Sequence, residues 1–206
     1  MRPHKTRCRH IRLATNRAAM RPSVNRLSIK LSLPVPASAG LAGGACTTEY
    51  QPSFSEFLLV FPAPPEVKAV KQSIGATTDL MDTVIAELVS KDAYLKAEFV
   101  EVDDPDYLQD TTAELAMQGL LDYARIYAIE NASFSAVQKE DGSWVAEMKG
   151  LRQFPIGGKK VTWVYRINAY YGRKSILIQH AAASVKDYPT QAIMNFLGVR
   201  VDAGKT

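Results

Sequence analysis

The chain has 206 residues, of which 47% are hydrophobic and 22% are charged, so it is ordinary in composition and long enough for one globular domain with a tail. Its net charge of +4 is unevenly distributed: nine of the 25 basic residues and none of the 21 acidic ones lie in residues 1–46, which leaves 16 basic against 21 acidic residues in the body. The body is therefore mildly acidic, and because it has no concentrated basic stripe it is not expected to bind nucleic acid.

Residues 1–46 have the pattern of a targeting segment rather than of a folded element. A basic, acid-free lead comes first, and Met20 is a candidate for the true start because MRPSVNRLSIK, 20–30, makes a short basic region. The weakly apolar run LSLPVPASAGLAGGA, 31–45, follows it. This order predicts export, and an Arg-rich organelle transit peptide is the alternative.

Two cleavage sites compete within this segment. ASA at 37–39 satisfies the small-x-small rule and predicts cleavage before Gly40, which gives a soluble periplasmic or secreted protein. GGAC at 43–46 resembles a bacterial lipobox and predicts cleavage before Cys46, although Leu41 lies two positions earlier than that pattern requires. Cys8, the only other cysteine, would be removed with the lead, so a lipid on Cys46 would leave no free thiol in the mature chain. The lipid would anchor the protein at the periplasmic side of a membrane.

Four strands are expected after a polar tether at 47–53. Aromatic and branched residues predict a strand over 54–61, which three prolines end, and a second short strand lies within 67–76. The run 82–89 places Val84, Ala86 and Leu88 on one face, and 93–102 alternates as a further strand. A helix over 79–101 is the alternative, but the turn signal SKD between the runs favours a hairpin.

A long helix is predicted within 110–132. Thr111 and Glu114 have the spacing of a capping box, and the apolar stripe consists of Leu115, Met117, Leu120, Leu121, Ala124, Ile126 and Ile129. Strands are then expected over 132–140, 143–151, 159–172 and 174–184, with a turn at Asp141-Gly142 and a loop at 155–158. A short helix from Pro189 to about Leu197 ends at Gly198, and 202–206 form a tail.

This order of strands, long helix, antiparallel meander and closing helix predicts one α+β domain over 54–201, with helices flanking an antiparallel β-sheet. The layout and four phrases resemble the PsbP-like family, which includes bacterial secreted proteins and lipoproteins. The phrases are VFPAPPEV, LAMQGLLDYARIYA, VTWVYRINAYYGRKSILIQHAAAS and AIMNFLGVRV. The resemblance implies an α/β/α sandwich with a non-enzymatic assembly or binding role, and it transfers no catalytic, metal or cofactor residues.

Few residues are candidates for chemistry. His180 is the only histidine of the body. It could act as a general base or as a ligand, but a structural role as a histidine packed in the sheet is the favoured interpretation. No second His or Cys completes a zinc site there. Four carboxylates within eight residues are weak candidates for binding calcium: Asp103, Asp104, Asp106 and Asp110. Their spacing does not match the EF-hand pattern, so a solvated loop is the favoured interpretation.

Aromatic residues are the candidates for binding. Trp163 and Tyr165 are expected on one face of their strand and Tyr170 on the other. Tyr171, the next residue in the sequence, belongs to the same group of candidates. Core packing is the favoured role for part of this set, and an exposed strip would suit contact with a protein or ligand.

The sequence therefore predicts an exported, lipid-anchored protein that binds another protein of the cell envelope as an accessory or assembly factor, without a cofactor. Two alternatives remain open: a small periplasmic hydrolase-like enzyme that uses His180, and a small-ligand carrier with a pocket between helix and sheet. The enzyme requires His180 in a cleft beside Asp, Glu or Ser, and the carrier requires a closed apolar cavity.

Overall fold

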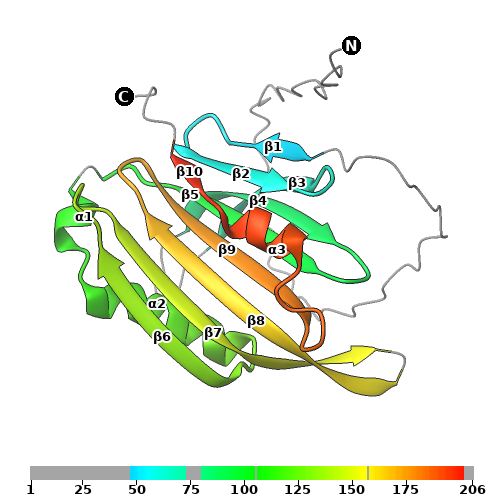
Figure 1. Cartoon of the computed structure of the whole chain (residues 1–206). Coiled ribbons are helices and arrows are strands. Elements are labelled where there is room, and N and C mark those ends of the chain that lie inside the picture. The colour runs from blue at the N-terminus through cyan, green and yellow to red at the C-terminus, as the bar shows by residue number, and fades with distance from the viewer. Residues whose placement is uncertain (1–46, 73–79, 105, 157, 202–206) are drawn as a thin grey trace, which may run out of the picture. The chain divides into compact units, whose positions relative to one another are not determined.

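The computed structural model describes residues 47–72, 80–104, 106–156 and 158–201. The fold is α+β with antiparallel β-sheet predominating, since 53% of it is strand and 17% is helix. The expected class and the antiparallel sheet are therefore confirmed. Figure 1 shows the arrangement of the helices and strands.

The central sheet has seven strands, and every neighbouring pair is antiparallel. Hairpin neighbours along the chain make most of it, and the pairing of β5 with β9 joins its two halves across 80 residues of sequence. The predicted hairpin over 82–102 is confirmed and the helix there is excluded. In sheet order the strands are β3 (Glu66–Gln72), β4 (Met81–Val89), β5 (Tyr94–Glu101), β9 (Ser175–Ser184), β8 (Lys159–Tyr171), β7 (Trp144–Ile156) and β6 (Glu130–Gln138).

A smaller three-stranded sheet consists of β1 (Thr48–Tyr50), β2 (Phe57–Phe61) and β10 (Arg200–Val201). Residues 48–50, expected to belong to a tether, pair instead with 59–61, and the Tyr50 ring packs edge-on against Phe99 at 5.7 Å. Burial of the Tyr50 ring explains this difference, because it favours an ordered strand over a solvated tether.

The two faces of the central sheet carry separate hydrophobic clusters, because alternate residues of each strand point to opposite sides. The long helix α2 (Ala113–Ile126) covers one face. The short helix α3 (Gln191–Leu197) and β2 cover part of the other face, as Figure 1 shows. Strand β9 serves both clusters, with Leu177 on the α3 side and Ile178 on the α2 side.

Helix α2 begins one residue later than the capping-box pattern predicted. The hydroxyl of Thr112, rather than that of Thr111, accepts the hydrogen bond of a first-turn amide, Leu115 N, at 3.2 Å. The Thr111 hydroxyl instead donates to Tyr107 O of the short preceding helix α1 (Tyr107–Asp110). The buried face of α2 consists of Ala116, Leu120, Tyr123 and Ala124, so Leu115 and Ile126 of the predicted apolar stripe are 58% and 70% exposed.

The closing helix follows its prediction closely. Thr190 caps α3 by accepting from Ile193 N at 3.2 Å, Ile193 and Phe196 are buried, and Gly198 ends the helix. The predicted Asp141-Gly142 turn is also confirmed, with Gly142 at φ +83°. The loop expected at 155–158 is shorter, because β7 continues to Ile156.

Candidate functional site

The candidate site lies between α2 and the central sheet, around the only histidine of the body. His180 is on β9 and is fully buried on the α2 face. Pairing of β9 with β5 places Lys96 opposite His180 and brings Glu98, two residues further along β5, to a diagonal position. His180 Nε2 lies 3.0 Å from Glu98 Oε1, a close electrostatic contact that does not have hydrogen-bond geometry. The structure therefore brings a histidine and a carboxylate together that the sequence left unpaired.

Glu98 is the centre of this cluster. Its side chain is only 2% exposed, and Lys96 Nζ lies 2.6 Å from Oε1. The other oxygen accepts from Gln72 Nε2 at 2.6 Å and from the Tyr123 hydroxyl at 3.2 Å. One carboxylate thus connects β3, β5 and helix α2, as buried charges require partners.

The charges of the cluster follow from these contacts. Burial raises the pKa of Glu98, but the adjacent His180 imidazole and the Lys96 ammonium outweigh burial and lower that pKa to about 2. Burial lowers the pKa of His180, and the Glu98 carboxylate offsets this only in part. We therefore assign an ionised Glu98, a charged Lys96 and a neutral His180 whose Nε2–H faces Glu98.

Aromatic rings close the cluster from the helix side. The rings of Tyr123, Tyr127 and Tyr165 meet the imidazole edge-on, with centroids 5.1, 5.5 and 6.1 Å away. The Tyr165 hydroxyl lies 3.3 Å from His180 Nδ1, so both ring nitrogens face partners. Such a histidine can hold a fixed polar arrangement, but it has no open side toward a substrate.

The structure separates the aromatic residues singled out in the sequence. Trp163 and Tyr165 are buried on the α2 side, as their alternation predicted, and Tyr171 packs against the same cluster. Tyr170 lies on the opposite side, where its ring is 6.0 Å from Phe57. Their main role is packing, and only the half-buried Tyr170 and Tyr171 retain access.

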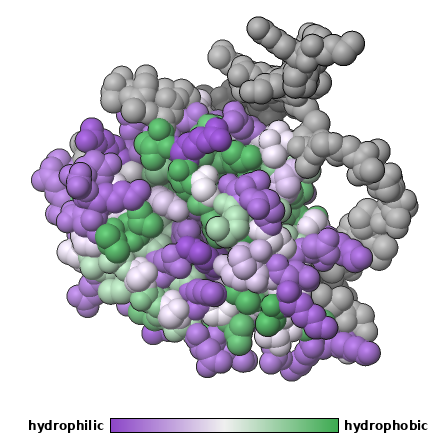
Figure 2. Space-filling model, in the orientation of Figure 1, coloured by the Kyte–Doolittle hydropathy of each residue, from purple (hydrophilic) through white to green (hydrophobic). Residues whose placement is uncertain are grey.

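A polar chain crosses β7 and β8 beside α3, and the Tyr170 hydroxyl at its end donates to the carbonyl oxygen of Leu197, the last residue of α3, at 3.5 Å. Arg166 Nη2 contacts Glu147 Oε2 at 2.5 Å, Arg166 Nε donates to Asn168 Oδ1, and Asn168 Nδ2 donates to the Tyr170 hydroxyl. Figure 2 looks onto this side of the molecule and shows hydrophilic and hydrophobic residues interspersed. Non-obligate interfaces share this mixed composition with protein surfaces in general, so it is compatible with a contact surface but does not identify one.

The aspartate run lies at and before α1. Asp104 Oδ1 accepts from the Asp106 amide, and Asp106 Oδ1 accepts from Gln109 Nε2, so these carboxylates stabilise the turn locally. Asp103 precedes this turn and Asp110 ends α1. Among the residues that the structure describes, no three His, Cys, Asp or Glu side chains gather as a metal ion would require.

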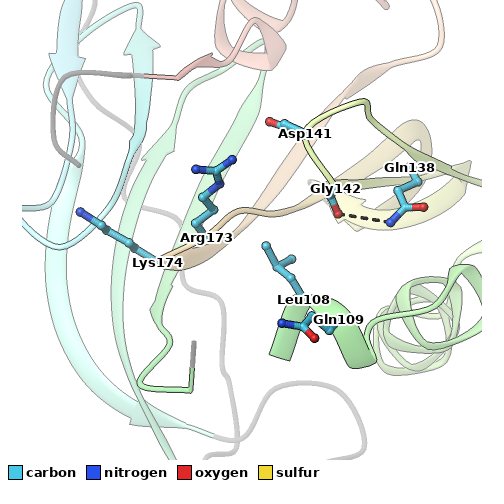
Figure 3. A pocket seen from close by; sticks show the side chains of 7 residues that line it. All are labelled: Leu108, Gln109, Gln138, Asp141, Gly142, Arg173 and Lys174. Atoms are coloured by element: carbon cyan, nitrogen blue, oxygen red, sulfur yellow. Dashed lines mark hydrogen bonds between the residues drawn. The ribbon is translucent and has the colours of Figure 1, made fainter. Parts of the chain in front are cut away.

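Figure 3 shows a hollow of the described surface, an open depression of about 590 Å³ at the end of the sheet where three segments meet. Arg173 and Lys174 come from the β8–β9 turn, Asp141 and Gly142 from the β6–β7 turn, and Leu108 and Gln109 from α1. It is open to solvent and does not lie between α2 and the sheet, where the carrier alternative requires a closed apolar pocket.

Sequence reasoning missed the surroundings of Arg152, because the following residues resembled a plain hairpin loop. The guanidinium lies over three rings, 4.8 Å from Tyr127, 4.7 Å from Phe154 and 5.5 Å from Tyr165. The sequence did contain one signal that sets this segment apart: residues 151–163 include three basic residues and no acidic one.

Cys46 falls outside the described residues, so the structure does not bear on its lipidation. No helix of the described chain is both long and apolar enough to cross a membrane. Comparison of the sequence with protein-family models and with curated proteins gave no match.

Proposed function

We propose that this protein is exported, carries a lipid on Cys46 at the periplasmic side of a bacterial membrane, and acts by binding another envelope protein as an accessory or assembly factor. The acid-free basic lead and the GGAC sequence support export and lipidation. The mixed-polarity face of β7 and β8 beside α3 is compatible with contact by a non-obligate partner.

The burial of His180 is the observation that carries a binding role over catalysis. A general base must reach the proton that it abstracts. His180 instead has no exposed surface and is enclosed by Glu98 and three tyrosine rings. The carrier alternative requires a cavity between α2 and the sheet, where buried side chains of both elements pack into one hydrophobic cluster.

We further propose that the fold is the α/β/α sandwich of the PsbP-like family. The support is the position of α2 and α3 on opposite faces of one antiparallel sheet, in the chain order that the resemblance implies. That family's binding and assembly roles agree with the role proposed here.

The intact mass of the mature protein, measured with its location after cell fractionation, tests export and anchoring. We expect a chain that begins at Cys46, is heavier by its acyl groups and sediments with membranes. Cys46→Ser should release the protein from the membrane fraction, whereas the matched change Cys8→Ser should leave mass and location unchanged. A soluble chain beginning at Gly40 would contradict the anchor, and an unprocessed cytoplasmic chain would contradict export.

The non-catalytic role is tested separately with His180→Gln in a deletion strain. We expect this variant to restore the envelope phenotype as the unaltered protein does, provided that circular dichroism shows it folded. Loss of function in a folded His180→Gln variant would favour the enzyme.

A further inference from the structure

Strands β7 and β8 continue past the rest of the sheet as a two-stranded ribbon. The pairing of β6 with β7 reaches only to Leu151, and that of β9 with β8 only to Trp163. Residues 153–156 and 159–162 therefore pair only with each other, and Arg152 pairs with Trp163, the last residue of β8 that also pairs with β9. Figure 1 shows the two yellow strands running beyond β6 and β9. We call residues 152–156 and 159–163 the basic ribbon.

The basic ribbon is cationic on an acidic body. It carries Arg152, Lys159 and Lys160, and no Asp or Glu occurs across 151–163, whereas the chain after residue 46 has five more acidic than basic residues. Lys159 and Lys160 are exposed. Within the described part of the chain, none of the three cations is in an ion pair. The charges of Lys159 and Lys160 therefore remain available to an anionic surface, whereas the Arg152 guanidinium is stacked on the rings of Tyr127, Phe154 and Tyr165.

Apolar side chains alternate with the cations on one side of the ribbon. Arg152 is opposite Trp163, and Phe154 is opposite Val161, which places all four on the α2 face. The Phe154 and Trp163 rings are 5.2 Å apart, and the Arg152 guanidinium covers Phe154 at 4.7 Å. Trp163 is buried, and Phe154 and Val161 pack against the hydrophobic cluster under α2, so these side chains fix the ribbon to the body and leave its exposed lysines as the contact.

We propose that the basic ribbon binds the surface of a bilayer containing anionic phospholipid, with Lys159 and Lys160 at the headgroups. A projecting ribbon that carries exposed lysines and no acidic residue matches a laterally uniform anionic surface better than the separate side chains of a protein partner. The proposal rests on the proposed function in one respect, namely that the mature chain works beside a membrane. Ribbon and lipid anchor would together provide the two signals that stable membrane binding requires.

Vesicle co-sedimentation tests the proposal. The chain from residue 46 with Cys46→Ser is used, because all described strands and helices lie between Thr48 and Val201 and because the basic residues of 1–46 would themselves bind anionic vesicles. We expect it to sediment with vesicles of phosphatidylcholine and phosphatidylglycerol, less so as salt is raised, and not with phosphatidylcholine alone. Lys159→Gln with Lys160→Gln should weaken binding by about 25-fold, since each lysine near an anionic surface contributes about fivefold.

The matched control replaces Lys68 and Lys91, two exposed lysines elsewhere on the molecule, by Gln. It should bind as the parent does. Equal weakening in both double variants, or absence of vesicle binding, would overturn the proposal, as would binding of the ribbon to polyglutamate but not to vesicles. Because the test uses an unlipidated chain, its failure leaves the separate result for Cys46 acylation and export unaffected.

Discussion

At the scale of single residues, substitution of Glu98 is expected to destabilise the fold strongly. Its buried carboxylate balances the ammonium of Lys96, whose side chain is only 14% exposed. Glu98→Gln keeps the shape but leaves that cation without its counter-charge. We expect it to lower the free energy of unfolding by about 3 kcal/mol in urea at neutral pH. The same change at Glu147, in a half-exposed pair with Arg166, should cost less than about 1 kcal/mol. Equal costs would contradict the central position of Glu98.

The same cluster predicts that acid destabilises the protein. The folded pKa of Glu98, about 2, lies below its ordinary 4.5, so its contribution of about 3 kcal/mol is present above pH 4.5 and is lost as the pH falls toward 2. Burial also lowers the pKa of His180 from 6.5, so below that pH the unfolded chain binds a proton that the folded chain does not. Both effects have the same sign.

Urea unfolding measured from pH 7 to pH 2 checks this prediction. The free energy of unfolding should fall throughout, and in Glu98→Gln the fall below pH 4.5 should be smaller by the Glu98 share. A variant whose pH profile parallels that of the parent would show that Glu98 is not the responsible group.

At the scale of the element, the start of α2 distinguishes two adjacent threonines. Thr112→Ala removes the side chain that accepts from Leu115 N and should cost about 1 kcal/mol. Thr111→Ala removes only a hydroxyl that donates to Tyr107 O and should cost less. Thermal unfolding of the two variants decides between the observed cap and the one that the capping-box pattern predicted.

Two glycines predict opposite effects of the same substitution. Gly119 lies inside α2, and an added Cβ would have its nearest contact at 3.5 Å, so Gly119→Ala should stabilise by about 0.5–1 kcal/mol. At Gly150 on β7 the added Cβ would come within 2.8 Å of Glu130 O and 2.4 Å of Ile129 Cγ2. Gly150→Ala should therefore destabilise by about 1–3 kcal/mol in the same assay. A stabilising Gly150→Ala would contradict the close packing of β6 on β7.

These elements also show how far the sequence could predict the structure. Alternation placed Val84, Ala86 and Leu88 on one face, and turn residues located most hairpins, because both signals are local. The Glu98–His180 contact could not be predicted, since it depends on the pairing of β5 with β9, which lie far apart in the sequence. Which threonine caps α2, Thr112 or Thr111, likewise depends on α1, a helix that no pattern in the sequence indicated.

At the scale of the whole molecule, the two hydrophobic clusters should unfold as one unit. They lie on opposite faces of the central sheet but share its strands, as the neighbours Leu177 and Ile178 on β9 show. Both tryptophans, Trp144 and Trp163, are on the α2 side. Their fluorescence therefore reports on one face alone, whereas circular dichroism reports on the entire sheet.

Leu59→Ala tests this coupling, because Leu59 is fully buried on the opposite side, in the α3 cluster. We expect a loss of about 2–5 kcal/mol, with the urea midpoint shifted equally in tryptophan fluorescence and in circular dichroism. Met148→Ala, which acts on the α2 side, is the matched control and should also shift both signals together. A Leu59→Ala variant that loses ellipticity before its fluorescence changes would show that the faces unfold separately, and the sheet would then not transmit stability from one cluster to the other.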